Sequence, residues 1–180
     1  MDYNLCSREN SSIMKKKQTN PNISKNFMNH NHELCVESAL KDFKQHFIEK
    51  KLKLTPLRLK VFQLVLKDHR PLGAYQILDL LRKDGFSSTP PIAYRVLDFL
   101  IEHGFVHKIK KLNAFVACSH PGNSHSPTFI ICRKCEKVAE INEKESGLKF
   151  NKETSSEFKI EEAIIEFIGI CKNCIKLEVI

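Results

Sequence analysis

Apolar residues recur at helical spacing in four successive stretches between residues 34 and 104. Steps of three and four residues place them on one face of each stretch, which is the pattern of amphipathic helices packed on a common core. The apolar positions of the first three stretches are Val36, Leu40, Phe43 and Phe47, then Leu57, Val61, Leu64 and Val65, then Ile77, Leu78, Leu80 and Leu81. We therefore expect helices from Leu34 onward.

Local signals set the ends of these helices. Thr55-Pro56 and Thr89-Pro90 each join a capping hydroxyl to a proline suited to the first helical turn, so a helix is expected to begin at each. Gly85 stops the third helix, and Gly104 suits the end of the fourth. The segment 70–73 contains proline and glycine and breaks the chain between the second and third helices.

The fourth predicted helix has two different faces. Its apolar face carries Ala93, Val96, Leu97 and Leu100, and its polar face carries Pro91, Tyr94, Arg95, Asp98 and Glu102. Two short alternating segments follow, 105–109 and 113–117, joined by a turn at Lys110-Lys111. Helices followed by a basic β-hairpin form the pattern of a winged helix-turn-helix, which places its last helix in the major groove of DNA.

Tyr94 and Arg95 are the candidate DNA-reading residues of this helix. The guanidinium of Arg95 can make two hydrogen bonds to a guanine edge, and Tyr94 can offer its ring to a thymine methyl or its hydroxyl to a phosphate. Lys110 and Lys111 are candidates for contacts that do not depend on base sequence. An ordinary solvated face would carry the same residue types, so the pattern alone leaves both interpretations open.

The basic charge is concentrated in the same region. The chain has 180 residues and a net charge of +8, of which residues 1–33 contribute +2, residues 34–117 contribute +7 and residues 118–180 contribute −1. This distribution indicates a polyanionic partner, with solubility charge as the alternative. Because the start is polar and no apolar run approaches membrane-spanning length, we expect a cytoplasmic protein with no membrane partner.

The chain divides into three parts of different character. Residues 1–33 are rich in Asn, Ser and Lys and predict a disordered tail. Residues 34–117 predict the winged-helix DNA-binding domain. In residues 118–180, strands are expected at 128–132 and 137–141, a weakly periodic helix at 144–157, and a β-rich run at 160–170. The expected fold class is α+β, a winged helix-turn-helix followed by a small α/β domain.

Four cysteines form two CxxC pairs, Cys132 with Cys135 and Cys171 with Cys174. Each pair supplies two thiolates from one tight turn, and Zn²⁺ takes four such ligands in a tetrahedron, so the pairs predict a structural zinc site. Without an export signal the thiols are expected to stay reduced, which favours a metal over disulfides. The alternative is a pair of redox-active dithiols. It is disfavoured because such a motif needs a βαβ context and neither pair is expected to open a helix.

A second group of ligand-type residues lies around the boundary between the hairpin and the last part of the chain. It consists of His107, Cys118, His120, His125 and Glu140. A mixed nitrogen, sulfur and oxygen set drawn from two domains suits a site that forms only in one domain arrangement, because a ligand favours only the state that it contacts differentially. This is the design of a metal sensor. Surface histidines and an exposed carboxylate are the alternative.

Over roughly residues 35–180 the chain resembles the Fur family of metal-dependent repressors, most closely its zinc-sensing branch. The resemblance is carried by both CxxC pairs and by the segments Leu54–Arg58 (LTPLR), Arg70–Tyr75 (RPLGAY), Pro90–Leu100 (PPIAYRVLDFL), Gly104–His107 (GFVH) and Leu112–Cys118 (LNAFVAC). It implies a homodimeric, cytoplasmic DNA-binding repressor that is not an enzyme and takes no small-molecule substrate, with residues 118–180 as its dimerisation domain.

The resemblance also implies the ligand sets. The structural zinc ligands would be Cys132, Cys135, Cys171 and Cys174, and the regulatory zinc ligands His107, Cys118, His125 and Glu140, with His120 as the alternative to His125. Tyr94 and Arg95 match the DNA-reading pair of the family. The family usually has threonine and valine where this chain has Ile92-Ala93, so the resemblance does not give the operator sequence.

These features together predict a zinc-responsive repressor that binds palindromic operators as a zinc-loaded dimer. That the operators belong to zinc-uptake genes is implied by the resemblance alone. The histidine-rich motif of iron-sensing relatives is missing, and Cys118 in the sensing set favours zinc over iron. Three alternatives stay open: an iron- or peroxide-sensing repressor of the same family, a CxxC dithiol oxidoreductase, and a zinc-ribbon interaction module.

Overall fold

The computed structural model describes residues 32–119, 121, 127–141 and 163–177. Its elements in chain order are α2 (His32–Glu49), α3 (Pro56–Leu66), β1 (Leu72–Gly73), α4 (Ala74–Lys83), α5 (Pro90–Glu102), β2 (Val106–Ile109), β3 (Ala114–Ala117), β4 (Thr128–Cys132), β5 (Val138–Ile141), β6 (Ile165–Gly169) and α7 (Lys172–Lys176). The predicted tail up to residue 31 and the predicted helix at 144–157 lie outside the described residues.

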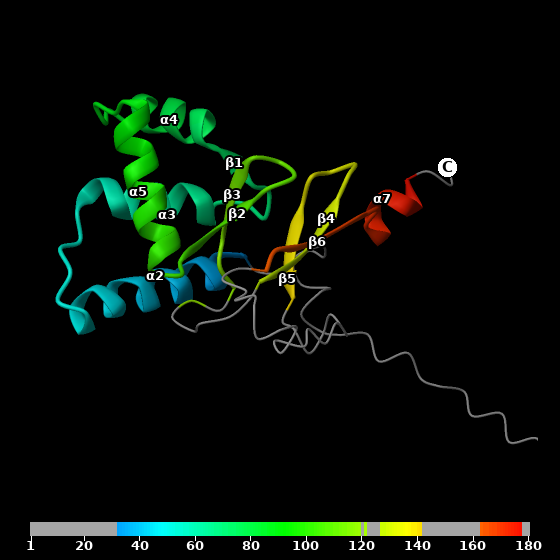
Figure 1. The fold of residues 1–180 in the computed structure, drawn as a ribbon, viewed down its shortest axis with the longest axis horizontal. Coiled ribbons are helices and arrows are strands. Elements are labelled where there is room, and N and C mark those ends of the chain that lie inside the picture. Colours follow the sequence, from blue (N-terminus) through cyan, green and yellow to red (C-terminus); the bar gives the residue numbers. More distant parts are fainter. Residues whose placement is uncertain (1–31, 120, 122–126, 142–162, 178–180) are drawn as a thin grey trace, which may run out of the picture.

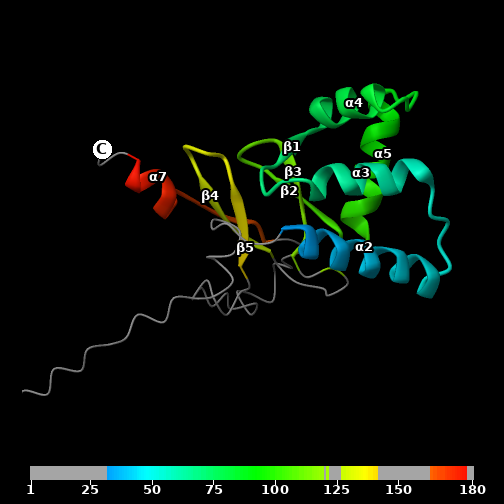
Figure 2. The ribbon, with the colours of Figure 1, turned by 180° about the vertical axis from the view of Figure 1, so that it is seen from behind.

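Helices α2–α5 gather at one end of the molecule, where α4 lies beside one end of α5 and α2 beside the other (Figures 1 and 2). Both predicted helix starts are confirmed, because Thr55 precedes α3 and Thr89 precedes α5. The Thr55 hydroxyl accepts the Arg58 N–H at 3.3 Å, whereas the Thr89 hydroxyl makes no capping hydrogen bond. Helix α2 begins at His32, two residues before its apolar pattern begins at Leu34.

The core of this end is built around stacked aromatic rings. The ring of Phe43 on α2 lies 4.3 Å from that of Phe62 on α3 and 4.8 Å from that of Phe105, measured between centroids. All three are at most 1% exposed. The apolar face of α5 is buried in the same core, as the sequence pattern predicts, and its members are Ala93, Val96, Leu97 and Leu100. The polar face of α5 therefore points outward.

The strands form two three-stranded sheets with the orders β1-β3-β2 and β5-β4-β6. In the first sheet, β2 and β3 make the predicted antiparallel hairpin, and the unpredicted two-residue β1 adds an edge by pairing Leu72 with Phe115. In the second sheet, β4 pairs antiparallel with β5 and parallel with β6. The strands β4 and β6 lie side by side between the hairpin and α7 (Figure 1).

The hairpin and the second sheet pack through a separate apolar cluster. It contains Ile109 and Val116 from the hairpin and Phe129, Ile131 and Val138 from β4 and β5. Strand alternation places His107 on the same side of β2 as Ile109, and Glu140 on the same side of β5 as Val138. The sheet packing thus brings ligand-type side chains of the two segments toward each other.

A carboxylate fastens the tip of the hairpin to the second sheet. Glu166 on β6 accepts the backbone N–H of Lys110 through Oε1 at 2.6 Å and that of Lys111 through Oε2 at 2.9 Å. A backbone bond from the Val138 N–H to the His69 carbonyl, at 3.1 Å, makes a further link between the helical end and β5. The helical end with its hairpin and the second sheet are therefore joined at several separate points.

The end of the described chain corrects one expectation. Helix α7 follows Cys171 directly and contains Cys174, so the expectation that neither CxxC pair opens a helix is wrong for the second pair. At five residues the helix is too short to show an apolar period in the sequence. In the part of the chain that the structure describes, no helix combines the length and apolar character needed to cross a membrane.

Candidate metal centres and DNA-binding face

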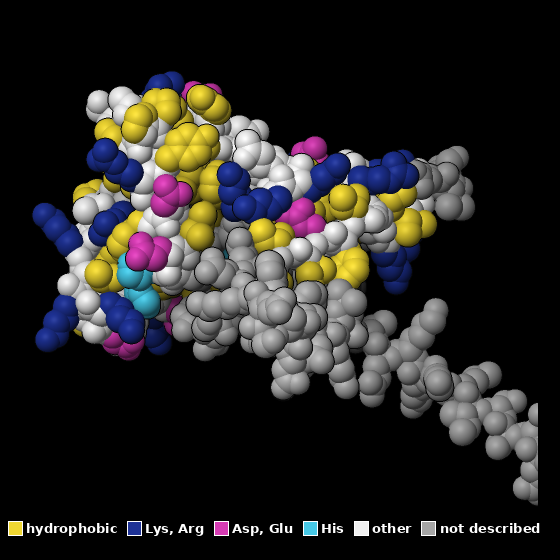
Figure 3. Space-filling view, in the orientation of Figure 1, with side chains coloured by type: hydrophobic (Ala, Val, Ile, Leu, Met, Phe, Trp, Pro, Cys, Tyr) yellow, Lys and Arg dark blue, Asp and Glu magenta, His cyan; other side chains and the backbone are white. Residues whose placement is uncertain are grey.

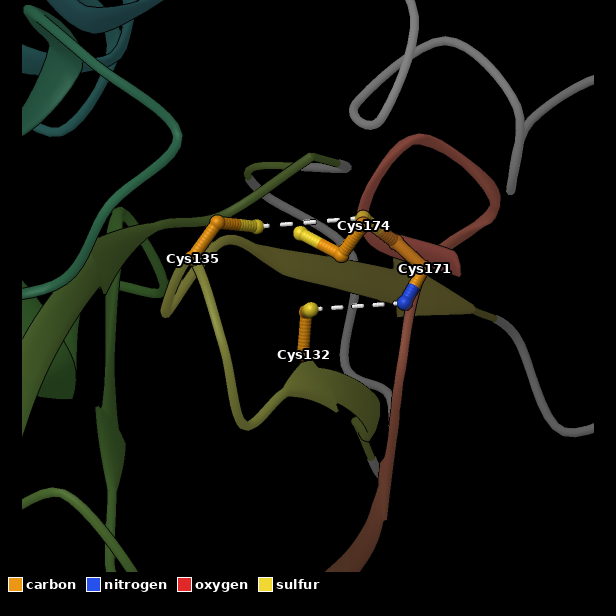
Figure 4. A group of neighbouring side chains, drawn as sticks. All are labelled: Cys132, Cys135, Cys171 and Cys174. Carbon is orange, nitrogen blue, oxygen red and sulfur yellow. Dashed lines mark hydrogen bonds between the residues drawn. The ribbon is translucent and has the colours of Figure 1, made fainter. Parts of the chain in front are cut away.

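The two CxxC pairs meet in space (Figure 4). Cys132 ends β4, Cys135 lies in the turn before β5, and Cys171 and Cys174 flank the start of α7. The parallel register pairs Cys132 with Gly169, two residues before Cys171, and so places the two turns beside each other. All four sulfur atoms lie within 4.8 Å of one another. The predicted four-cysteine group is therefore present as one cluster.

The spacing of the sulfur atoms fits a tetrahedral zinc ion. Zn–S bonds of about 2.3 Å in a tetrahedron place two sulfurs about 3.8 Å apart, and the Sγ atoms of Cys135 and Cys171 are 3.8 Å apart. The Cys132 sulfur is fully buried and accepts the Cys171 N–H at 3.3 Å. Cys132 and Cys174 are buried, and Cys135 and Cys171 are half-buried. Four sulfur ligands would fill a tetrahedron and leave no coordination position for water, which suits a structural ion rather than a reactive one.

Protonation in the cluster also suits a cation. Burial acts to raise the pKa of Cys132, but hydrogen bonds from the backbone N–H groups of Cys135, Cys171 and Lys134 outweigh it and lower that pKa to about 6. Burial raises the pKa of Cys135, and the pKa of Cys174 rises to about 12, first through its hydrogen bond with Cys171. One thiolate is thus formed at neutral pH, and a bound cation would release the protons that the neighbouring thiols retain.

The second predicted group is also assembled, in part. Ligand atoms of His107 on β2, Cys118 just after β3 and Glu140 on β5 lie within 4.8 Å of one another. Cys118 and Glu140 are each 6% exposed. The three residues offer one nitrogen, one sulfur and one oxygen ligand, which is a set that Zn²⁺ accepts. His125 and its alternative His120 lie outside the described residues, so the fourth ligand stays a prediction.

The surroundings of Glu140 keep its carboxylate in place. Its Oε2 accepts the N–H of Ser119 at 2.7 Å, and its Oε1 lies 3.5 Å from Nε2 of His107. The backbone around Cys118 is fixed as well, because its N–H donates to the Phe105 carbonyl at 2.9 Å. A cavity of about 420 Å³ reaches Cys118 and Glu140, which gives an ion a route to this group.

The candidate DNA-reading residues lie on the outer face of α5. Tyr94 is 38% exposed, and Arg95 and Asp98 are exposed beside it. Lys110 and Lys111 are exposed at the hairpin turn. Figure 3 shows lysine and arginine side chains spread over the helical end and onward to α7. The structure thus leaves all four candidates open to solvent, on one helix and one turn.

Sequence reasoning missed Glu166, which binds the hairpin turn from β6. The available signal was a single carboxylate inside the apolar segment Ile164–Ile168, where a charge is unusual unless it has a partner. That signal cannot identify the partner, because the two N–H groups belong to residues more than fifty positions earlier.

Comparison with known proteins agrees with this geometry. Residues 49–168 match the model of the Ferric uptake regulator family. The Zinc uptake regulation protein of Escherichia coli (strain K12) is 34% identical over 132 residues, which cover 72% of this chain and 77% of that protein. The Transcriptional regulator PerR of Clostridium acetobutylicum is 33% identical over 141 residues, which cover 75% of this chain and 97% of that protein.

A solved structure of a zinc uptake regulator in complex with zinc and DNA superposes with a TM-score of 0.73 at 31% identity, covering 81% of this chain and 98% of that one. The family match spans two thirds of the sequence and contains α3–α5, the hairpin, β4, β5 and most of β6, whereas α2 lies before it and α7 after it. The chain therefore belongs to the ferric uptake regulator (Fur) family.

Proposed function

We propose that this chain is a zinc-responsive DNA-binding transcriptional repressor, which binds palindromic operators of zinc-uptake genes as a zinc-loaded homodimer in the cytoplasm. The observation that carries the proposal is the group of His107, Cys118 and Glu140 between the hairpin and the second sheet. Two of its members follow α5 in the chain, and the third belongs to β5. A metal ion bound to this group would therefore affect the orientation of the helical end relative to the second sheet.

In this proposal the two groups have different roles. Cys132, Cys135, Cys171 and Cys174 hold a structural zinc ion that ties the end of β4 to α7. His107, Cys118 and Glu140, together with His125 or His120, hold a regulatory ion. Bound there, zinc supplies bonds that link the hairpin to β5. The soft thiolate of Cys118 favours zinc over harder divalent ions.

DNA binding requires that the two α5 helices of the dimer keep one fixed arrangement. Two copies of α5 must meet successive major grooves of a palindrome, about 34–36 Å apart. Tyr94 and Arg95 on the exposed face of α5 supply base contacts, and Lys110 and Lys111 supply contacts to phosphates. Residues 34–117 would act as the DNA-binding domain and residues 118–180 as the dimerisation domain. Zinc bound between them raises the fraction of dimers that fit the operator.

Two observations support this proposal over its alternatives. The match to a zinc uptake regulator bound to zinc and DNA covers most of the chain, and Cys118 places sulfur in the sensing group. A dithiol oxidoreductase is disfavoured because all four CxxC sulfurs lie in one cluster, and a zinc-bound thiolate is not free to attack a disulfide. We accordingly propose no enzymatic activity.

The test is operator binding at controlled concentrations of free zinc, iron and manganese, together with metal analysis of the purified protein. We expect zinc to be retained after purification, and added zinc to increase binding to a palindromic promoter fragment while iron and manganese do not. Activation by iron or manganese, with loss of binding after peroxide treatment, would instead support the peroxide-sensing alternative suggested by the PerR relative. Failure to bind any promoter DNA would favour the interaction module.

A further inference from the structure

Two histidine side chains meet where the end of α5 approaches α2, away from both groups described above. His46 lies in the last turn of α2, and His103 is the residue that caps the C-terminus of α5. Nε2 of His46 and Nδ1 of His103 are 3.3 Å apart. Both residues are half-buried, and Figure 3 shows histidine side chains at the surface of this junction.

Aromatic neighbours restrict the orientation of both imidazoles. The His103 ring lies 4.3 Å from that of Phe99, and the His46 ring lies 4.9 Å edge-on to that of Phe105, between centroids. Phe105 is 1% exposed and is part of the stacked core. The two imidazoles are thus held against a rigid wall on one side and face solvent on the other, so little ordering would be needed to bind a ligand there.

The geometry fits a shared metal ion. Two imidazole nitrogens at about 2.0–2.1 Å from one tetrahedral ion lie about 3.3–3.4 Å from each other. The nitrogens of His46 and His103 are at this separation in a hydrogen bond, which a shared ion would replace. Burial, His103 and Lys50 lower the pKa of His46, with Glu49 opposing them, so its ring stays neutral as a metal ligand must be. Glu49, three residues further along α2, is exposed and accepts a hydrogen bond from Gln45 Nε2 at 2.8 Å, so we do not count it as a ligand.

We propose that His46 and His103 form a further site for a divalent transition-metal ion that prefers imidazole, such as zinc, with water completing its coordination. An ion held there joins the C-terminal end of α5 to α2 and stabilises the helical end against unfolding. The site uses none of the residues of the two groups described above. It therefore stands or falls independently of the proposed function.

The test compares zinc uptake by the full chain and by matched variants. Protein in which the four-cysteine cluster and the regulatory group already hold zinc is titrated with further zinc in competition with a chromophoric chelator. We expect the parent to take up one further equivalent per chain, and His46→Gln and His103→Gln each to lose it. Glutamine can still hydrogen-bond to the remaining histidine, so the contact between α2 and α5 is largely kept. His30→Gln, which removes a histidine of the predicted tail, serves as the control and should keep the equivalent.

A second measurement distinguishes binding from misfolding. Zinc added to the folded, labelled parent should shift the imidazole NMR signals of His46 and His103 together, and should raise the melting temperature of the parent more than that of either variant. Absence of the further equivalent in the parent, its retention in either variant, or unshifted signals for the pair would each overturn the proposal.

Discussion

Replacing Glu166 with alanine is expected to weaken operator binding at saturating zinc while leaving the dimer folded. The carboxylate accepts both backbone N–H groups of the hairpin turn, from Lys110 at 2.6 Å and from Lys111 at 2.9 Å. It thereby fastens the hairpin turn to β6, at the opposite end of β3 from Cys118. Without it, the helical end can tilt about the remaining contacts.

The size of the effect follows from these two bonds. Hydrogen bonds to charged groups contribute about 1.5–3 kcal/mol each when buried. Glu166 is only half-buried and water can replace it at the turn, so we take about 1–2 kcal/mol for the pair. A free-energy change of about 1.4 kcal/mol corresponds to a tenfold change in an equilibrium constant. Because the apparent affinity scales with the fraction of dimers in the orientation that fits the operator, we expect roughly a five- to thirtyfold loss of operator affinity.

The assay is a titration of labelled operator and of random DNA with the parent and the variant at saturating zinc. Glu37→Ala, which removes an exposed carboxylate from α2 and changes the net charge equally, is the matched control. We expect the loss for Glu166→Ala only, and mainly on operator DNA. Equal operator affinity for Glu166→Ala and Glu37→Ala would refute the idea that this contact sets the orientation.

Other substitutions address the remaining parts of the account. Cys132→Ser or Cys174→Ser should remove a tightly held zinc ion and prevent stable dimerisation, because such an ion contributes on the order of 10 kcal/mol of folding free energy in small zinc domains. A folded dimer without zinc, seen by sedimentation and metal analysis, would contradict the structural role. Arg95→Ala should cost about 1–3 kcal/mol on operator DNA and relax preference at one guanine position, so unchanged specificity would exclude base reading by this residue. Lys110→Ala and Lys111→Ala should weaken binding to all sequences alike and flatten its salt dependence.

The helical end could be predicted from the sequence because its signals are local. Thr55 and Thr89 mark helix starts within a few residues of the helices that they cap, and the apolar spacing on α5 separates its buried face from its exposed face. The hairpin at 106–117 was visible for the same reason, as alternation on both sides of a lysine turn. Features of this kind depend on neighbours in the chain and are little affected by the rest of the fold.

What the sequence could not give is the set of contacts between distant segments. The two CxxC pairs were visible, but their meeting depends on the parallel pairing of β4 with β6, which no local pattern encodes. Strand β1 is two residues long and exists only because Phe115 and its neighbour offer it a partner. The same limit explains why Glu166 was missed and why α7, a five-residue helix, was not expected.

The most direct test of the account is operator binding as a function of free zinc for the parent and for Cys118→Ser. Cys118 lies between the hairpin and the second sheet, within 4.8 Å of ligand atoms on both, and is 6% exposed. Cys6→Ser, at a cysteine of the predicted tail, is the matched control. We predict that Cys118→Ser keeps its structural zinc and its dimer mass but no longer gains operator affinity with zinc, whereas Cys6→Ser responds like the parent. A Cys118→Ser protein that switches with zinc as the parent does would contradict the proposal that this group is the sensor.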